Sequence, residues 1–100
     1  MKIKPKSIIA VDLDKTRCKE ECVTEEECFY ATPIKKTIDK INNLNRKGHF
    51  IIIHTSRKED LRLITEYWLK KNKVSYNVLV CEKLWADYYI DDKNLKINDL

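Results

Sequence analysis

The 100-residue chain has little of what marks disordered, linker or membrane segments. It contains a single glycine and two prolines, which argues against a disordered region or a flexible linker. Its longest clearly apolar runs, Ile8–Val11 and Phe50–Ile53, are far shorter than the roughly 20 residues that span a bilayer. The apolar stretch after the N-terminal lysines meets Asp12 too early for a signal peptide. We therefore expect a cytoplasmic protein without a membrane span.

The composition is that of a globular domain, with 43% hydrophobic and 36% charged residues. A chain of this length is expected to form one domain, over residues 1–100, with a small core. The net charge is +4, but lysine and arginine are interspersed with aspartate and glutamate along most of the chain. An ordinary solvated surface explains this pattern best. A weaker interpretation is that the positive balance attracts anionic, phosphorylated substrates.

Three of the four cysteines lie close together, as Cys18, Cys22 and Cys28, and Cys81 lies far from them. Their C-x3-C-x5-C spacing contains no C-x2-C pair and has no histidine nearby, so it predicts zinc only weakly. Without an export signal, reduced thiols are the expected state. A metal or redox role for the three-cysteine cluster is a minor alternative.

An apolar stretch runs directly into two carboxylates in Ile8–Thr16. Its length favours a buried strand, which places Asp12 and Asp14 at the carboxyl end of that strand. Ligands bind at this edge of an open α/β sheet. Alternation along a strand sends both carboxylates to one face and turns Leu13 away. With a backbone carbonyl they suit a hard cation such as Mg²⁺, although an acidic turn would explain such a motif taken alone.

The stretch over residues 17–31 is rich in glutamate and cysteine and has no sustained apolar period. We expect it to form an excursion over the mouth of the site, with a short hairpin as one form. Thr32-Pro33 then predicts a helix start, with threonine as N-cap and proline in the first helical position. Gly48 is the expected C-cap. Between these signals, apolar residues recur at helical spacing: Ile34, Ile38, Ile41 and Leu44.

Phe50–His54 is a β-branched run without alternation, which predicts a strand buried on both faces. The strand leads into Thr55-Ser56. Ser56 and Glu59 have the spacing of a capping box, which predicts a helix that reaches about Lys71. The expected apolar stripe of that helix consists of Leu61, Ile64, Trp68 and Leu69.

Two further strands are expected, at Tyr76–Val80 and Tyr88–Ile90, and the second runs into Asp91-Asp92. The alternation of strands and helices predicts an α/β fold, a three-layer Rossmann-like parallel sheet. Because parallel strands end at the same edge of a sheet, several polar side chains are expected to meet there. They are Asp12, Asp14, Thr55, Asp91 and Asp92, with Lys83 in the connection before the last strand.

These carboxylates support attack on a phosphate monoester, whose charge must be neutralised and whose phosphorus must be held in line. Mg²⁺ bound by Asp12, by Asp91-Asp92 and by a backbone carbonyl would screen the phosphoryl oxygens from the attacking group. Asp12 could then act as a nucleophile and form an aspartyl phosphate. Asp14 could protonate the leaving group and then deprotonate water.

The expected phosphate contacts are Thr55 and Ser56, at the start of a helix whose N–H groups favour anions, and Lys83, which adds positive charge. Arg57 beside them is a candidate specificity residue, although an exposed arginine at a helix start is an equal alternative. His54 faces away from Thr55 on the strand, so packing or an indirect contact is expected rather than a catalytic base.

Four motifs in this order resemble those of the haloacid dehalogenase (HAD) superfamily. They are a hydrophobic strand followed by Asp12-x-Asp14-x-Thr16, a hydrophobic strand followed by Thr55, then Lys83, and a hydrophobic strand followed by Asp91-Asp92. The resemblance covers residues 7–93. One such motif is a weak signal, but four in order are fairly specific.

The resemblance implies a Mg²⁺-dependent phosphohydrolase. Asp12 would be the nucleophile and a metal ligand, and Asp14 would be the acid/base and bind the metal through its carbonyl. Thr55 and Lys83 would contact the phosphate. Asp91-Asp92 would complete the metal site, the second acid directly and the first through a water. An acid at position 14 fits phosphatases and phosphotransferases better than dehalogenases.

HAD proteins usually carry a cap domain, and the spacing here leaves no room for one. Only 40 residues separate Asp14 from Thr55, and 27 separate Thr55 from Lys83, and expected helices and strands fill most of both intervals. The chain resembles small capless members with an open site. Its Lys83–Asp92 run is similar to that of enzymes associated with capsule or surface-sugar biosynthesis, which points to a sugar phosphate by analogy.

Two other function classes stay open. A non-catalytic binding or regulatory module could use the same scaffold, although loss of Asp12 or Asp14 would have favoured it more. A nucleic-acid-binding protein should show clustered basic residues with exposed aromatics, which Tyr88 and Tyr89 beside acids fit poorly. A capless phosphatase could still act on a nucleic-acid end or a protein. The expected partner is a phosphorylated small molecule, and a domain this small could form a homo-oligomer.

Overall fold

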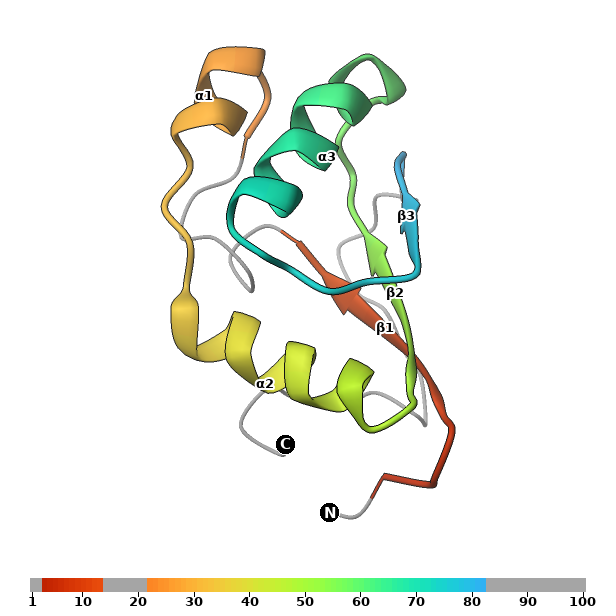
Figure 1. Ribbon diagram of the computed structural model, residues 1–100. Coiled ribbons are helices and arrows are strands. Elements are labelled where there is room, and N and C mark those ends of the chain that lie inside the picture. The colour runs from red at the N-terminus through yellow and green to blue at the C-terminus, as the bar shows by residue number, and fades with distance from the viewer. Residues whose placement is uncertain (1–2, 14–21, 83–100) are drawn as a thin grey trace.

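Strands and helices alternate along the chain in the computed structural model, which describes residues 3–13 and 22–82 (Figure 1). In chain order the elements are β1 (Ile8–Asp12), α1 (Glu25–Tyr30), α2 (Lys35–Arg46), β2 (Phe50–His54), the 3-10 turn η1 (Glu59–Leu61), α3 (Arg62–Lys71) and β3 (Val78–Val80). Among these elements, no helix is long and apolar enough to cross a membrane. Asp14, Cys18, Lys83 and the predicted strand Tyr88–Ile90 with Asp91-Asp92 lie outside the described residues.

The three described strands form one parallel sheet in the order β1-β2-β3. The pairing of β1 with β2 sets Asp12 beside His54, and the pairing of β2 with β3 sets His54 beside Val80. Each new strand pairs with the outer edge of the strand before it, so right-handed crossovers place α2 and α3 on the same face of the sheet. The predicted parallel α/β fold is confirmed for this part of the chain.

The core lies on the face of the sheet that α2 and α3 cover. Ile51 and Ile53 of β2 are fully buried there, whereas Phe50 is 42% exposed on the other face and His54 is half-buried. The expectation that this strand is buried on both faces is therefore wrong for the described structure. Its side chains alternate because the helices described pack against only one of its faces.

The predicted apolar stripes of the two long helices are confirmed. Ile38 and Ile41 of α2 and Trp68 and Leu69 of α3 are buried in one core with the strand residues. The indole Nε1–H of Trp68 donates to the carbonyl oxygen of Ala31 at 2.9 Å. This bond satisfies the polar group of a buried aromatic residue and ties α3 to the chain that precedes α2.

The segment before α2 contains a helix, α1, in place of the expected short hairpin. Glu27 N–H donates to Thr24 Oγ1, and Thr24 N–H donates to Glu27 Oε1, each at 3.1 Å, so Thr24 and Glu27 form a capping box. The rings of Phe29 in α1 and Tyr67 in α3 are stacked with centroids 5.9 Å apart. The T-x-x-E spacing of this capping box can be recognised in the sequence. In the folded protein α1 is also held by its contact with α3.

The limits of α2 agree with the prediction at one end only. The helix begins at Lys35, because Pro33 lies in a β bridge and Ile34 is still extended, so the Thr32-Pro33 start is wrong. At the other end Gly48 has φ +100° and follows the C-cap residue. Gly48 N–H donates to the carbonyl of Asn45 at 3.0 Å, and His49 N–H donates to the carbonyl of Leu44 at 3.2 Å. This is the pattern of a Schellman motif. Gly48 is thus confirmed as the residue that ends the helix.

The third strand is shorter than predicted, because Asn77 joins the sheet partly through its side chain. Asn77 N–H donates to the carbonyl of Ile51 at 2.9 Å. Asn77 Oδ1 accepts from the N–H of Ile51 at 2.8 Å and from Nδ2 of Asn45 at 2.9 Å. One side-chain oxygen thereby links α2, β2 and the start of β3.

We expect Asn77→Ala to destabilise the fold by about 1–3 kcal/mol, because the N–H of buried Ile51 loses its acceptor. Asn77→Asp should keep most of the stability, since it retains an oxygen at that position. Urea denaturation measures both effects, with Asn43→Ala, an exposed asparagine of α2, as the control. Equal midpoints for Asn77→Ala and the wild type would contradict this account.

Candidate functional site

The carboxyl ends of neighbouring strands β1 and β2 bring Asp12 and Thr55 to one edge of the sheet. Leu13 N–H donates to the carbonyl of His54 at 3.3 Å, and Thr55 N–H donates to the carbonyl of Val80 at 2.9 Å, so the pairing continues past the strand ends. The Asp12 side chain is 52% exposed, while Leu13 is fully buried and turned away from it. Ligands of open α/β sheets bind at this edge.

His54 lies next to Asp12 across the two strands. Its Nε2 is 4.0 Å from Asp12 Oδ1, and both side chains are partly exposed. Sequence reasoning placed His54 on the face away from Thr55 and expected no direct role. The strand register now puts its imidazole beside the carboxylate of the candidate site. A protonated His54 would attract the Asp12 carboxylate.

The loop that follows β2 is folded around the hydroxyl of Thr55. Thr55 is 1% exposed, and its Oγ1 accepts the N–H of Arg57 at 3.2 Å. Ser56 between them is exposed at the edge of the sheet. The structure thus brings two of the predicted phosphate contacts, Thr55 and Ser56, to the end of the strand beside Asp12.

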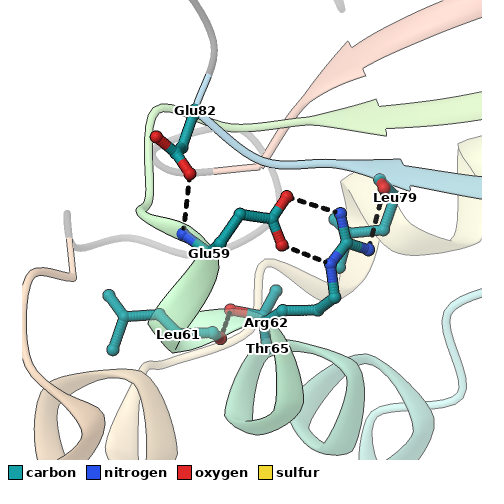
Figure 2. A network of polar contacts seen from close by, with 6 residues as sticks. All are labelled: Glu59, Leu61, Arg62, Thr65, Leu79 and Glu82. Atoms are coloured by element: carbon teal, nitrogen blue, oxygen red, sulfur yellow. Dashed lines mark hydrogen bonds and ion pairs between the residues drawn. The ribbon is translucent and has the colours of Figure 1, made fainter.

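Arg57 is buried, so the alternative of an exposed arginine at a helix start is wrong. It is 4% exposed, and its Nη1 donates to Thr65 Oγ1 at 3.0 Å. The hydroxyl of Thr65 donates in turn to the carbonyl of Leu61 at 2.7 Å (Figure 2). A guanidinium stays charged when buried and therefore needs hydrogen-bond acceptors. Thr65, which sequence reasoning did not single out, provides one under the loop.

We expect Thr65→Val to lower stability by about 1–3 kcal/mol, since it removes an acceptor from a buried cation at nearly constant volume. Thr65→Ser should lose less, about 0.8 kcal/mol for the missing methyl group, because the hydroxyl remains. Urea denaturation compares the two, and Thr37→Val, at a buried threonine of α2, is the matched control. A smaller loss for valine than for serine would contradict the role given to the hydroxyl.

The predicted capping box of Ser56 and Glu59 is wrong. The 3-10 turn η1 precedes α3, and Glu59 accepts bonds from Arg62 Nε at 2.8 Å and Nη2 at 3.0 Å. Arg62 Nη1 also donates to the carbonyl of Leu79 at 3.0 Å, which joins the helix start to β3 (Figure 2). The hydrogen bond from Arg62 lowers the pKa of Glu59. The side chain that would have closed the capping box is thus engaged with a cation one turn later.

The pair of Glu59 and Arg62 should stabilise the fold at neutral pH and cease to do so in acid. Because the pKa of Glu59 is lowered in the folded state, this stabilisation is present above the ordinary value of 4.5 and is lost as the pH falls through the lowered value. The stability difference between the wild type and Glu59→Gln should therefore shrink on acidification. Urea midpoints at about pH 7 and about pH 3 measure it. Asp60→Asn, at an exposed neighbour, should show no such change.

The three described cysteines, Cys22, Cys28 and Cys81, are buried. Burial raises the pKa of Cys81, which favours its neutral form. Among residues 3–13 and 22–82, no three side chains of metal-binding type lie together. Asp12 is the one predicted Mg²⁺ ligand that falls within these ranges, because Asp14 and Asp91-Asp92 lie outside them.

The comparisons with known proteins support the fold. No protein-family model matches the chain, and no curated protein matches it. A crystal structure of a structural genomics target from Vibrio cholerae matches with a TM-score of 0.75 at 22% identity, over 94% of this chain and 85% of that one.

Two structures of a Pnkp1/Rnl/Hen1 complex, one of them described as an RNA repair complex, match with a TM-score of 0.69 at 18% identity. The matches cover 87% and 84% of this chain but only 31% and 28% of those chains. The chain therefore spans less than a third of the length of the repair-complex chains. At these identities the likeness shows a shared α/β fold.

Proposed function

We propose that the chain is a Mg²⁺-dependent phosphohydrolase of the HAD type, which cleaves a phosphate monoester through an aspartyl phosphate on Asp12. The observation that carries this proposal is the pairing of β1 with β2, which sets the exposed Asp12 carboxylate beside the strand that ends in Thr55. The order of motifs along the sequence and the fold shared with solved α/β structures support it. A nucleophile and a phosphate contact on adjacent parallel strands suit phosphoryl transfer.

The proposed roles follow the chemistry of each group. Asp12 attacks phosphorus, and Asp14 protonates the leaving oxygen and then deprotonates the water that hydrolyses the intermediate. Thr55 donates its hydroxyl proton to a phosphoryl oxygen, and Lys83 offsets negative charge in the transition state. Asp12, the carbonyl of Asp14 and Asp91-Asp92 would hold Mg²⁺. When bound, the ion supplies charge neutralisation at the phosphoryl oxygens.

The strand order sets a condition on this metal site. β2 already occupies one edge of β1, and β3 lies beyond β2, so a strand that brings Asp91-Asp92 to Asp12 must pair with the opposite edge of β1. A strand added there would reverse the direction in which the sheet grows. Asp12 would then lie at a topological switch point, where ligands of open α/β sheets bind.

The substrate class follows from how open the site is. The connection between β2 and β3 contains only η1, α3 and a short turn, so it holds no cap domain. A site without a cap, as the sequence spacing predicts, could admit a sugar phosphate or the phosphorylated end of a larger molecule. The resemblance to capless enzymes of surface-sugar biosynthesis favours the former, and the fold shared with chains of an RNA repair complex makes a nucleic-acid end the second candidate.

The first experiment measures phosphate release from sugar phosphates, nucleotides, phosphopeptides, 5′- and 3′-phosphorylated oligonucleotides and an aryl phosphate, with and without Mg²⁺. We expect Mg²⁺-dependent turnover that Asp12→Asn lowers at least about 10³-fold, because the amide is a poor nucleophile. Asp39→Asn, at an exposed carboxylate of α2, is the matched control and should retain full activity. A preference for oligonucleotides that weakens with salt would select the second candidate.

The outcomes separate the function classes. Turnover that survives in Asp12→Asn would exclude the aspartyl nucleophile. Absence of turnover across the panel with Mg²⁺ still bound would point to a substrate outside it. Absence of both turnover and Mg²⁺ binding would contradict the phosphatase proposal and favour a non-catalytic module on this fold.

A further inference from the structure

Glu82, the residue before Lys83, holds the loop after β2 at two points. Its backbone N–H donates to the carbonyl of Arg57 at 2.8 Å. Its carboxylate oxygen Oε2 accepts the N–H of Glu59 at 3.3 Å (Figure 2). One residue at the end of β3 thus bonds to the loop on both sides of Lys58.

The same loop contains the proposed phosphate contacts. Thr55 N–H is bonded to Val80, and Arg57 N–H is bonded back to Thr55 Oγ1. The loop therefore has three attachments to the end of β3: one at Val80 and two at Glu82. Removing the carboxylate of Glu82 would leave the N–H of Glu59 without this acceptor, while the backbone bond to Arg57 and the strand pairing at Thr55 would remain.

The backbone of Glu82 has φ +59°, in the left-handed region that favours glycine. The chain therefore leaves β3 in a sharp turn at this residue.

We propose that Glu82 is a positioning residue for phosphate recognition: its carboxylate holds the Thr55–Glu59 loop in a fixed arrangement beside the end of β3. This inference rests on the proposed function, since it assigns Glu82 to the same site. Glu82 needs no contact with the substrate. It acts by holding the loop that contains Thr55 and Ser56, and small displacements of such groups are costly to the rate of phosphoryl transfer.

The test compares Glu82→Ala with Glu82→Gln in an assay with an aryl phosphate and Mg²⁺. Both variants keep a Cβ, so the strain of the positive φ stays nearly the same, and only glutamine keeps an oxygen that can accept from Glu59 N–H. We expect Glu82→Ala to lower kcat/KM by roughly 10- to 100-fold, with KM raised and kcat lowered. Glu82→Gln should stay within about threefold of the wild type, because its amide oxygen replaces the acceptor.

Glu59→Gln is the matched control, because it breaks the pair with Arg62 but keeps the backbone N–H that binds Glu82. It should lower stability without lowering kcat/KM.

Affinity for inorganic phosphate with Mg²⁺ provides a measurement that does not depend on knowing the substrate, and Glu82→Ala should weaken it. Equal rates and equal phosphate affinity for Glu82→Ala and an active wild type would overturn this inference alone. A wild type that neither hydrolyses the aryl phosphate nor binds phosphate would overturn the proposed function, and this inference with it.

Discussion

The parallel pairing of β1 with β2 is the constraint on which the rest of the structure depends. The register places Val11 beside Ile53 on the buried face and Asp12 beside His54 on the other. A shift of one residue would exchange these faces, burying a carboxylate and exposing an isoleucine. The burial of Ile51 and Ile53 under two helices therefore fixes which side chains of β1 reach the site. Core packing and site geometry are consequences of the same pairing.

A second set of interactions holds the loops at the carboxyl edge of the sheet. Arg57 is buried under the loop after β2 and bonded to Thr65, while Arg62 joins the start of α3 to Leu79 of β3. Glu82, just beyond the end of β3, accepts the N–H of Glu59. All three contacts lie within the β2–α3–β3 unit, and they connect the loop after β2 to α3 and to the end of β3. These bonds occupy the N–H groups of Thr55, Arg57 and Glu59 and so hold the backbone of the loop in one arrangement.

Periodicity in the sequence was sufficient to predict β1, the bodies of α2 and α3, β2 and the parallel α/β arrangement. The starts of helices were predicted less well, because capping depends on which hydrogen-bond acceptor binds the N–H groups of the first turn in the folded protein. Ser56 and Glu59 have the spacing of a capping box, yet Glu59 binds Arg62 and its N–H is accepted by Glu82, 23 positions further along the chain. No local pattern encodes that competitor. The capping box of Thr24 and Glu27, in contrast, is purely local and could have been recognised.

For the candidate site, the sequence predicted which residues stand at the strand ends but not their surroundings. The burial of Arg57 depends on Thr65, a helix residue whose hydroxyl faces the loop only after α3 has packed. The proximity of His54 to Asp12 depends on a register between strands that a single strand does not specify. Motif order can locate reactive groups along the chain, whereas their neighbours are determined by tertiary packing.

The face of the sheet opposite the core bears on how the sheet would be completed. Within the described part of the chain it carries Ile8, Phe50, Val78 and Val80, which are between 39% and 73% exposed. Apolar side chains gathered on one sheet face favour a covering element. The described helices pack against the opposite face of the sheet, so burial of these side chains requires a further element on this face.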